Sequence, residues 1–413
     1  MLNKTGRAAA AAFAAAIALA GCTSGSTSPS QQFFDASVLA EGAAKLDSTV
    51  MAFFVGPQND EMYTVVGEVH KPGYVVLVKA DGTFHSIATK RMDMMRPAWS
   101  EHGLYFADED SDYRLTASGL TKFANAKVTA QNLGFALPDG GSVGVYNGGN
   151  GNDGGYNNQI AVTTNTAARV YDVQGNYFTG ALCDGQVFGL TNNPGTHAGQ
   201  APKSAGMISA TDDTAVPQML ARLYPADGGE KIVGWRPQFG SGTPIGQVPC
   251  HDGVISFLSW ETDAAGQETP KIVSWNTVTG EHQEHGLTFD GAATQLTFED
   301  FGYVVQDWRD GRLHWVYADG RVFATDAATG KTTALFDTGL GTGPSRPTRT
   351  LYAFSDGQLH VLSTLPGGEG NIKYTSFDRG NGNVTHEVSV PIPNTEVNIS
   401  YLNLSHMAVP AHP

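Results

Sequence analysis

Short apolar runs separated by turns that contain glycine dominate the chain, as in the segment VFATDAATGKTTAL at 322–335. Val322 and Phe323 belong to one apolar run, Asp326 and Gly330 are residue types that tolerate turn conformations, and a second β-prone run follows. This pattern predicts a β-hairpin. Fifty glycines, spread between runs rich in Val, Tyr, Phe, Thr and Leu, predict many tight turns and few long helices, so the expected fold class is all-β.

The same hairpin pattern recurs along the chain. An apolar strand, then Asp or Asn, then Gly four residues later occurs again with Asn276 and Gly280 and with Asp378 and Gly382. The steps of about 50 residues lie in the range of β-propeller blades. Four looser copies bring the number of turns to seven, at Asp81, Ser118, Asp172 and Asp212. We therefore predict a single β-propeller with seven four-stranded blades, and six or eight blades are the alternatives.

A second turn, which ends in glycine, alternates with the first along the repeats. Its copies end at Gly103, Gly185, Gly253, Gly302 and Gly357. Each repeat would form an antiparallel sheet whose two apolar faces are buried by neighbouring blades around an axis. Because 49–56 and 395–405 are both strand-like, we expect one end of the chain to complete a blade begun at the other end.

The N-terminus has the composition of an export signal. Lys4 and Arg7 precede an apolar stretch at 8–18, which is short for a membrane span, and the run Leu19-Ala20-Gly21-Cys22 follows it. This run resembles the lipobox of bacterial lipoproteins, which implies cleavage before the cysteine and attachment of a lipid to its sulfur. The alternative is an ordinary secretory signal with an incidental cysteine.

The lipobox resemblance implies both a domain organisation and a location. It implies a signal peptide at 1–21 and a lipidated Cys22. The small polar residues that follow predict a flexible tether at 22–32, and the repeats predict a β-propeller domain at 33–413. Acyl chains such as palmitate on Cys22 would hold the protein at the extracytoplasmic face of the bacterial cell membrane. The net charge of -15, from 25 Lys and Arg against 40 Asp and Glu, opposes binding to nucleic acid and to anionic lipid, so the acyl chains must provide the anchor.

The run RPAWSEHGLYFA at 96–107 resembles the repeat of Tol-type periplasmic β-propellers. In that repeat, Pro-x-Trp-Ser precedes a Pro-Asp-Gly turn and an apolar strand. Pro97, Trp99, Ser100 and Gly103 match it, whereas the two residues before Gly103 differ. The resemblance is close in this one repeat and elsewhere extends mainly to the turns. It supports a propeller fold and implies no particular activity.

Cys183 and Cys250 precede the turn glycines of two neighbouring repeats. In an oxidising envelope this placement predicts a disulfide, and two buried free thiols are the alternative. No spacing of His and Cys around them indicates a zinc site or a nucleophile.

The run ADEDSDYR places Asp108, Asp110 and Asp112 on alternate residues of a loop. Carboxylates in such an arrangement could converge on Ca²⁺, the one cofactor that the sequence suggests. The run lacks the glycine and the later acid of a complete calcium loop. The alternative is therefore a solvated acidic turn.

The dipeptide Arg-Pro occurs three times, with its arginines at Arg96, Arg236 and Arg346, and we expect each copy to precede an inner strand. This placement predicts three guanidinium groups at one rim of the central channel, where they would suit a carboxylate or a phosphate. Trp99 and Trp235 lie beside two of these connections and would add a stacking surface for a sugar or a peptide. The alternatives are arginines that cap strands or pair with acids, and tryptophans buried between blades.

The sequence contains no zincin motif and no P-loop motif, and no two acids stand out as a catalytic pair. The favoured hypothesis is a non-enzymatic, lipid-anchored β-propeller that binds an envelope protein, a peptide or a glycan. The alternative is an extracytoplasmic propeller enzyme, either a glycan hydrolase or lyase or a calcium-dependent lactonase-like hydrolase. A scaffold that resembles the outer-membrane insertion lipoproteins is a third hypothesis.

Overall fold

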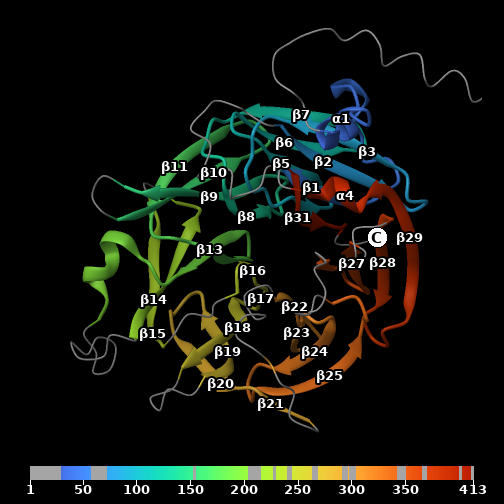
Figure 1. The fold of residues 1–413 in the computed structure, drawn as a ribbon. Coiled ribbons are helices and arrows are strands. Elements are labelled where there is room, and N and C mark those ends of the chain that lie inside the picture. Colours follow the sequence, from blue (N-terminus) through green and yellow to red (C-terminus); the bar gives the residue numbers. More distant parts are fainter. Residues whose placement is uncertain are drawn as a thin grey trace, which may run out of the picture.

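The described part of the chain forms seven sheets around a central axis (Figure 1). Each sheet is a blade, with an inner strand next to the axis and an outer strand at the circumference. The predicted all-β class and the seven-bladed propeller are confirmed. The computed structural model describes residues 29–56, 72–151, 155–202, 215–226, 229–239, 244–262, 268–290, 296, 304–341, 350–364, 370–399 and 402–410.

In blades 2, 3, 5 and 7 the four strands follow one another along the chain, from the inner strand outward. Blades 2 and 3 are formed by β4 (Ala98–Ser100), β5 (Gly103–Ala107), β6 (Ser111–Thr116) and β7 (Gly119–Ala124), and by β8 (Gln131–Ala136), β9 (Ser142–Asn150), β10 (Tyr156–Thr163) and β11 (Ala168–Gln174). Blades 5 and 7 are formed by β17 (Cys250–His251), β18 (Val254–Thr262), β19 (Glu268–Asn276) and β20 (His282–Gly286), and by β26 (Thr350–Phe354), β27 (Gln358–Ser363), β28 (Asn371–Asp378) and β29 (Val384–Pro393).

Blades 4 and 6 each carry a short additional strand that pairs in parallel with its neighbour. Blade 4 contains β12 (Thr179–Cys183), β13 (Gln186–Thr191), β14 (Ala215–Tyr224), β15 (Lys231–Phe239) and the additional β16 (Gly246–Gln247). Blade 6 contains β22 (Val305–Arg309), β23 (Arg312–Val316), β24 (Arg321–Asp326), β25 (Lys331–Asp337) and the additional β21 (Thr288–Phe289). The strand β16 lies on the inner side of its blade, and β21 lies on the outer side.

Strands from both ends of the chain share blade 1, as predicted. Its order from outside to inside is β3 (Phe84–Thr89), β2 (Gly73–Lys79), β1 (Thr49–Gly56), β31 (Leu402–Ala408) and the short β30 (Asn398–Ile399). The strands β1 and β31 are antiparallel, with Ala52 opposite Ala408. This pairing joins the two ends of the chain and so closes the ring of blades.

The turn that recurs in the sequence has the same conformation in blades 5, 6 and 7. In the β24–β25 turn, Asp326 Oδ1 accepts two backbone N–H groups at 3.0 Å, and Gly330 has a φ of +73°. A Cβ atom on Gly330 would lie 2.1 Å from the carbonyl oxygen of Gly286, so the position requires glycine both for its dihedral angle and for space. The equivalent pairs are Asn276 with Gly280 and Asp378 with Gly382.

One of the looser turn assignments is wrong. Asp172 lies inside β11, opposite Gln159 of β10, and the turn between these strands is at 164–167. Asp is one of the commonest turn residues, but nothing in its local sequence separates a turn aspartate from one on the exposed edge of an outer strand. Asp212 and Gly302 lie outside the described residues.

Apolar clusters fill the spaces between neighbouring blades. Trp275 and Ile255 of blade 5 pack against Leu190 of blade 4, and Trp315 of blade 6 packs against Leu258 of blade 5. Because both faces of a blade contact a neighbour, strands in the middle of a blade, such as β5, are buried along their whole length.

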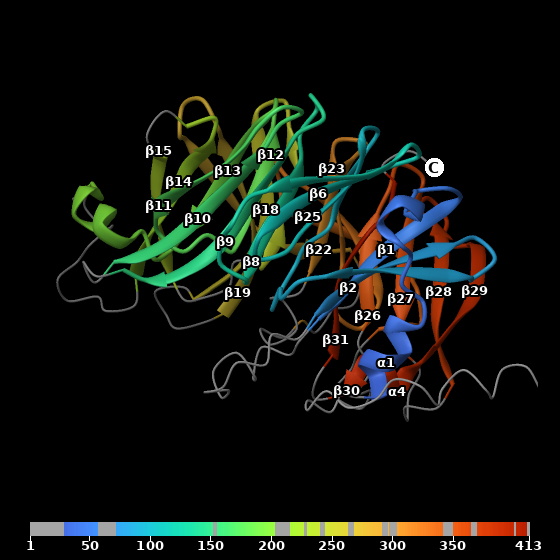
Figure 2. The ribbon, with the colours of Figure 1, turned by 90° about the horizontal axis from the view of Figure 1, so that it is seen from above.

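The two faces of the ring carry different segments. We call one the connector face: there each outer strand leads to the next inner strand, through segments such as 90–97 and α4 (Asn394–Val397). The other, the hairpin face, carries the turns that join the first strand of a blade to the second, such as Asp184–Gly185 between β12 and β13. The helix α1 (Pro29–Asp35) contacts α4, and Figure 2 shows the two helices together at the edge of the ring.

The helix α1 is held on blade 1 by two aromatic residues. Phe34 is fully buried and stacks on Tyr74 with ring centroids 5.3 Å apart, and the Tyr74 hydroxyl donates to Asp35 at 2.8 Å. Residues 29–32, which were expected in the flexible tether, therefore belong to a helix. The other described helical segments are the 3₁₀ turns η1 (Glu41–Ala43) and η2 (Gly195–Gln200), and no described helix is long and apolar enough to cross a membrane.

Candidate binding site in the central channel

The strand β16 narrows the central channel. It is the innermost strand of blade 4, and it contacts β8 of blade 3 and β22 of blade 6. The backbone N–H groups of Gly246 and Val248 donate to carbonyl oxygens beside and within β12 at 2.8 and 2.9 Å. Residues 244–249, which lead into blade 5, therefore run along the channel wall toward the hairpin face.

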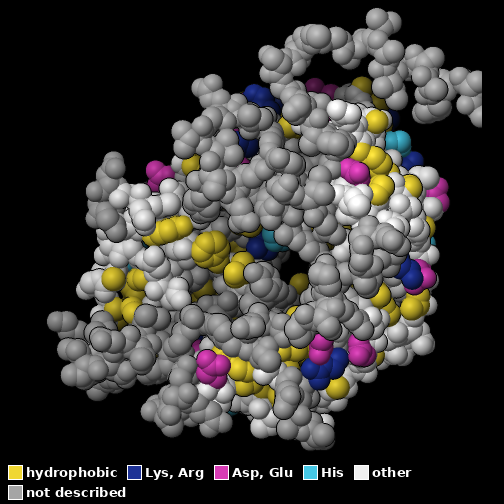
Figure 3. Space-filling model, viewed as in Figure 1, with side chains coloured by type: hydrophobic (Ala, Val, Ile, Leu, Met, Phe, Trp, Pro, Cys, Tyr) yellow, Lys and Arg dark blue, Asp and Glu magenta, His cyan; other side chains and the backbone are white. Residues whose placement is uncertain are grey.

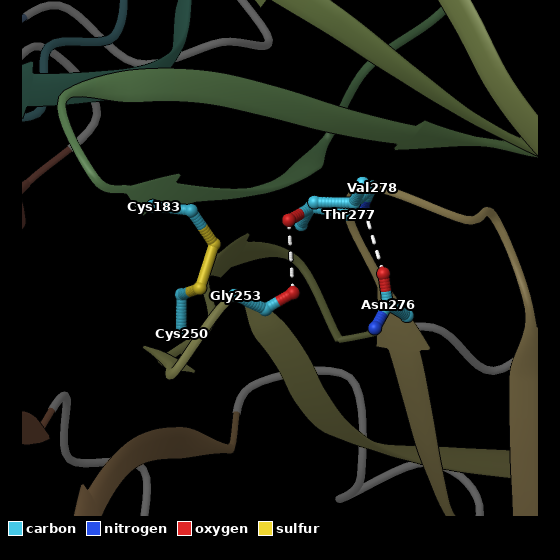
Figure 4. Close-up of a disulfide and its surroundings, with 6 residues drawn as sticks. All are labelled: Cys183, Cys250, Gly253, Asn276, Thr277 and Val278. Carbon is cyan, nitrogen blue, oxygen red and sulfur yellow. Dashed lines mark hydrogen bonds between the residues drawn. A yellow bond between two sulfur atoms is a disulfide. The ribbon is translucent and has the colours of Figure 1, made fainter.

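A disulfide holds the far end of this segment. Cys183 at the end of β12 is bonded to Cys250 at the start of β17, with their Cα atoms 5.4 Å apart (Figure 4). Beside it, the Thr277 hydroxyl donates to the carbonyl oxygen of Gly253 at 2.8 Å, which ties the β19–β20 turn to the β17–β18 turn. The structure thus joins the two cysteines that the sequence analysis paired, and the bond links blades 4 and 5.

Arg96 approaches the channel from the connector face. It precedes β4, and its backbone N–H donates to Gln131 Oε1 of β8 at 2.9 Å. A Cβ atom on Gly246 would lie 3.1 Å from Arg96 Nη1, so the glycine leaves room for the guanidinium group beside β16. Figure 3 shows a basic side chain and a histidine at the margin of the central opening, with hydrophobic side chains beside them.

The guanidinium group of Arg96 has no carboxylate partner among the described residues, and its Nε is buried without a hydrogen bond. Burial lowers the pKa of Arg96 to about 10, so the group remains charged at neutral pH. Burial and the Arg96 charge also lower the pKa of His406 in β31 well below its ordinary value, against the effect of a hydrogen bond to the backbone of Met95. At neutral pH the described part of the site therefore holds one positive charge without a carboxylate partner, beside a neutral imidazole.

A small cavity lies next to Arg96, between blades 2 and 3. It has room for a group the size of a water molecule or slightly larger, and not for a sugar ring. Polar residues in its wall are Arg96, Tyr105, Asp112, Gln131, Ser142 and Tyr146. Burial and the charges of Asp112 and Asp108 raise the pKa of Tyr146 well above its ordinary value, so its hydroxyl keeps its proton.

The three aspartates predicted as calcium ligands each form hydrogen bonds or ion pairs with other groups of the protein. Asp112 pairs with the buried Lys127 at 3.1 Å and also accepts from Asn125 and Thr163. Asp108 accepts from the Tyr113 hydroxyl and from nearby backbone N–H groups, and Asp110 forms an exposed ion pair with Lys90. The described residues contain no group of three or more His, Cys, Asp and Glu side chains arranged to hold a metal ion.

The predicted cluster of arginines is not assembled. Arg236 lies inside the outer strand β15 and Pro237 follows it within that strand, so this Arg-Pro pair does not precede an inner strand. Arg346 lies outside the described residues. The prediction failed for Arg236 because the dipeptide does not reveal which strand of a blade contains it.

Arg236 belongs instead to a buried ion network between blades 4 and 5. It donates to Glu261 at 2.6 Å and to Glu284 at 2.7 Å, and Lys271 lies 3.2 and 3.3 Å from the same two glutamates. Burial alone would raise the pKa of Glu261, but Arg236, a Ser259 hydroxyl and Lys271 hold it below its ordinary value. With two charges of each sign, the network is electrically balanced and has a structural role.

The two predicted stacking tryptophans lie apart. Trp99 is in the inner strand β4 and packs on the core between blades 1 and 2. Trp235 is in β15 and packs on the core between blades 3 and 4. Both match the alternative, in which tryptophans are partly buried between blades, and they do not form one surface.

Sequence reasoning missed His406, Gln131 and Tyr146 as neighbours of Arg96. His406 follows the strand-like end of the chain, which was expected to complete a blade, and that expectation is the one signal that points to the channel. Gln131 and Tyr146 belong to the next blade, and nothing in their local sequence distinguishes them from other buried polar residues.

No protein-family model matches the sequence, and no curated protein is significantly similar to it. Similar solved structures include AztD from Citrobacter koseri, with a TM-score of 0.43, 12% identity and coverage of 87% of this chain and 97% of that one. The apocarotenoid oxygenase of Synechocystis has a TM-score of 0.42 and 10% identity, covering 86% and 93%. BamB from Moraxella catarrhalis has a TM-score of 0.37 and 12% identity, covering 72% and 73%. At these values the similarities carry no argument about function.

Proposed function

We propose that this chain is a lipid-anchored β-propeller of the bacterial cell envelope that binds a protein, peptide or glycan partner at the connector-face end of its channel. The observation that supports this function is the Arg96 guanidinium group, which lies in the channel without a carboxylate partner among the described residues. A partly desolvated arginine without an ion pair is costly in a folded protein, and an acidic group of a partner would offset that cost.

The position of α1 relates the proposed anchor to the proposed site. Six residues separate Cys22 from Pro29, so the chain between them spans at most about 25 Å. Because α1 contacts α4, which belongs to the connector face, a lipid on Cys22 would keep the Arg96 end of the channel close to the membrane. The partner would then be a protein or glycan that is itself held at that membrane.

The test uses the full chain with Cys22 intact, isolated from native membranes after mild crosslinking. Wild-type protein, Arg96→Gln and Arg169→Gln are compared for co-purifying protein and glycan. Arg169 is the matched control because it is an exposed arginine on the outer strand β11, far from the channel.

We expect one partner to be recovered with wild type and with Arg169→Gln, and to be reduced at least severalfold with Arg96→Gln. Equal recovery with all three forms would place the contact elsewhere on the ring. Recovery of the propeller alone, together with turnover of a glycan substrate, would overturn the binding function in favour of an enzyme.

A further inference from the structure

Two side chains in the wall of the cavity between blades 2 and 3 carry hydrogen-bond donors that no acceptor among the described residues uses. Gln131 is 4% exposed, and its Oε1 accepts the backbone N–H of Arg96, while its Nε2 has no partner among the described residues. Tyr146 is 1% exposed, and its hydroxyl likewise has no hydrogen-bond partner there. Both residues line the cavity.

The charges around the cavity favour a monovalent anion. Arg96 is part of the wall, and its guanidinium group has no carboxylate partner among the described residues. Asp112 is also in the wall, but its negative charge is balanced by Lys127 and its oxygens accept from Asn125 and Thr163. Two negative charges on a ligand would exceed the one positive charge that Arg96 supplies, whereas a single negative charge is matched by it.

The size and geometry of the cavity narrow the choice further. The space admits a small group and excludes a ring, so only the end of a ligand can enter it. A carboxylate offers two oxygens with several lone-pair sites, which suits one amide N–H, one hydroxyl and a neighbouring guanidinium group. The glycines Gly134 and Gly144 in the wall keep this space open, because a Cβ atom on either would approach Gln131 Nε2 or the Tyr146 hydroxyl to within 2.9 Å.

We propose that this cavity binds a single carboxylate group, held by Gln131 Nε2 and the Tyr146 hydroxyl and balanced by Arg96. The ligand that we infer is the C-terminal carboxylate of a peptide that enters from the channel. This choice of ligand rests on the proposed function, in which the channel binds a partner. A free carboxylate such as acetate has the same chemistry and occupies the site more weakly, because it makes no contacts outside the cavity.

Isothermal titration of the full-length protein tests this proposal with acetate, with a short peptide that has a free C-terminus and with the same peptide amidated. Ionic strength is kept constant with chloride. We expect saturable binding of acetate, tighter binding of the peptide acid and at least tenfold weaker binding of the amide. Tyr146→Phe removes one hydroxyl and keeps the ring, so it should weaken peptide-acid binding severalfold, and Arg96→Gln should weaken it at least tenfold.

The matched control Arg169→Gln should bind like wild type. Absence of saturable binding by both carboxylates, or equal binding of the peptide acid to wild type and Tyr146→Phe, would overturn the proposal. Failure of the proposed function looks different, since acetate and peptide acid would still bind while no envelope partner is captured. If a partner is captured and neither carboxylate displaces it, the carboxylate site is wrong and the proposed binding function is still supported.

Discussion

The disulfide between Cys183 and Cys250 should contribute a measurable part of the stability of the ring. It joins the inner strands of blades 4 and 5 and holds the end of the segment that narrows the channel. The perturbation is its removal, either by reduction of the wild-type protein or by the double substitution Cys183→Ala with Cys250→Ala. Cys183 is 3% exposed, so the alanine form also loses some packing.

The magnitude follows from the length of chain that the bond closes. The two cysteines are 67 residues apart. Loop entropy gives about 3 kcal/mol for a loop of about 15 residues and about 5 kcal/mol for a loop of about 100, so about 4 kcal/mol is expected here. With a urea m-value of about 3 kcal/mol/M, the unfolding midpoint should fall by about 1 M.

Equilibrium unfolding in urea, followed by tryptophan fluorescence, measures this difference. Oxidised wild type, reduced wild type and the alanine form are compared. The reduced protein keeps both sulfurs, so its difference from the oxidised protein isolates the bond, and the alanine form should unfold at the same or a slightly lower urea concentration. Coincident midpoints for oxidised and reduced wild type would refute the reasoning.

Three further predictions concern the stability of the fold. Burial lowers the pKa values of His314 and His360 from 6.5 to about 4, so folding favours their neutral forms. Each histidine therefore contributes about 3 kcal/mol to the free energy of unfolding above pH 6.5, and this contribution is lost as the pH falls to about 4. Thermal melts across this window should show the loss, and a flat profile would contradict it. Arg236→Met should lower the free energy of unfolding in urea by about 3 to 5 kcal/mol, because Glu261 loses its main partner. In the control Arg169→Gln, which changes an exposed arginine, the same free energy should change by less than about 0.5 kcal/mol. Gly330→Ala should lower the free energy of unfolding in urea by more than about 1 kcal/mol. The control is Gly357→Ala, where an added Cβ meets nothing within 4 Å, and an equal loss in the two variants would show that the Gly330 turn adapts.

The number of blades could be predicted from the sequence because the β-turn recurs with nearly the same chemistry. Asp326, Asn276 and Asp378 each start a turn in which a side-chain oxygen caps two backbone N–H groups, and such local bonds are visible in the order of residues. Asp172 was assigned to a turn and lies in a strand, yet the count stayed correct because repeat length limits how many blades the chain can form.

The site was less predictable because it depends on contacts between blades. Arg96 was identified through its Arg-Pro dipeptide, but the same dipeptide at Arg236 lies in an outer strand and serves a different purpose. The neighbours of Arg96 come from β8, β16 and β31, and their register against β4 is set by packing around the whole ring. Local patterns contain no information about that register.

The pairing of β1 with β31 makes the integrity of the ring depend on the last residues of the chain. Until those residues are available, β1 presents an unpaired hydrogen-bonding edge, which is the kind of edge that recruits other strands. Two molecules caught in this state can exchange their terminal strands, each completing the other's first blade with the same hydrogen bonds. Intramolecular closure and strand exchange thus compete, and protein concentration decides between a closed monomer and an interlocked dimer.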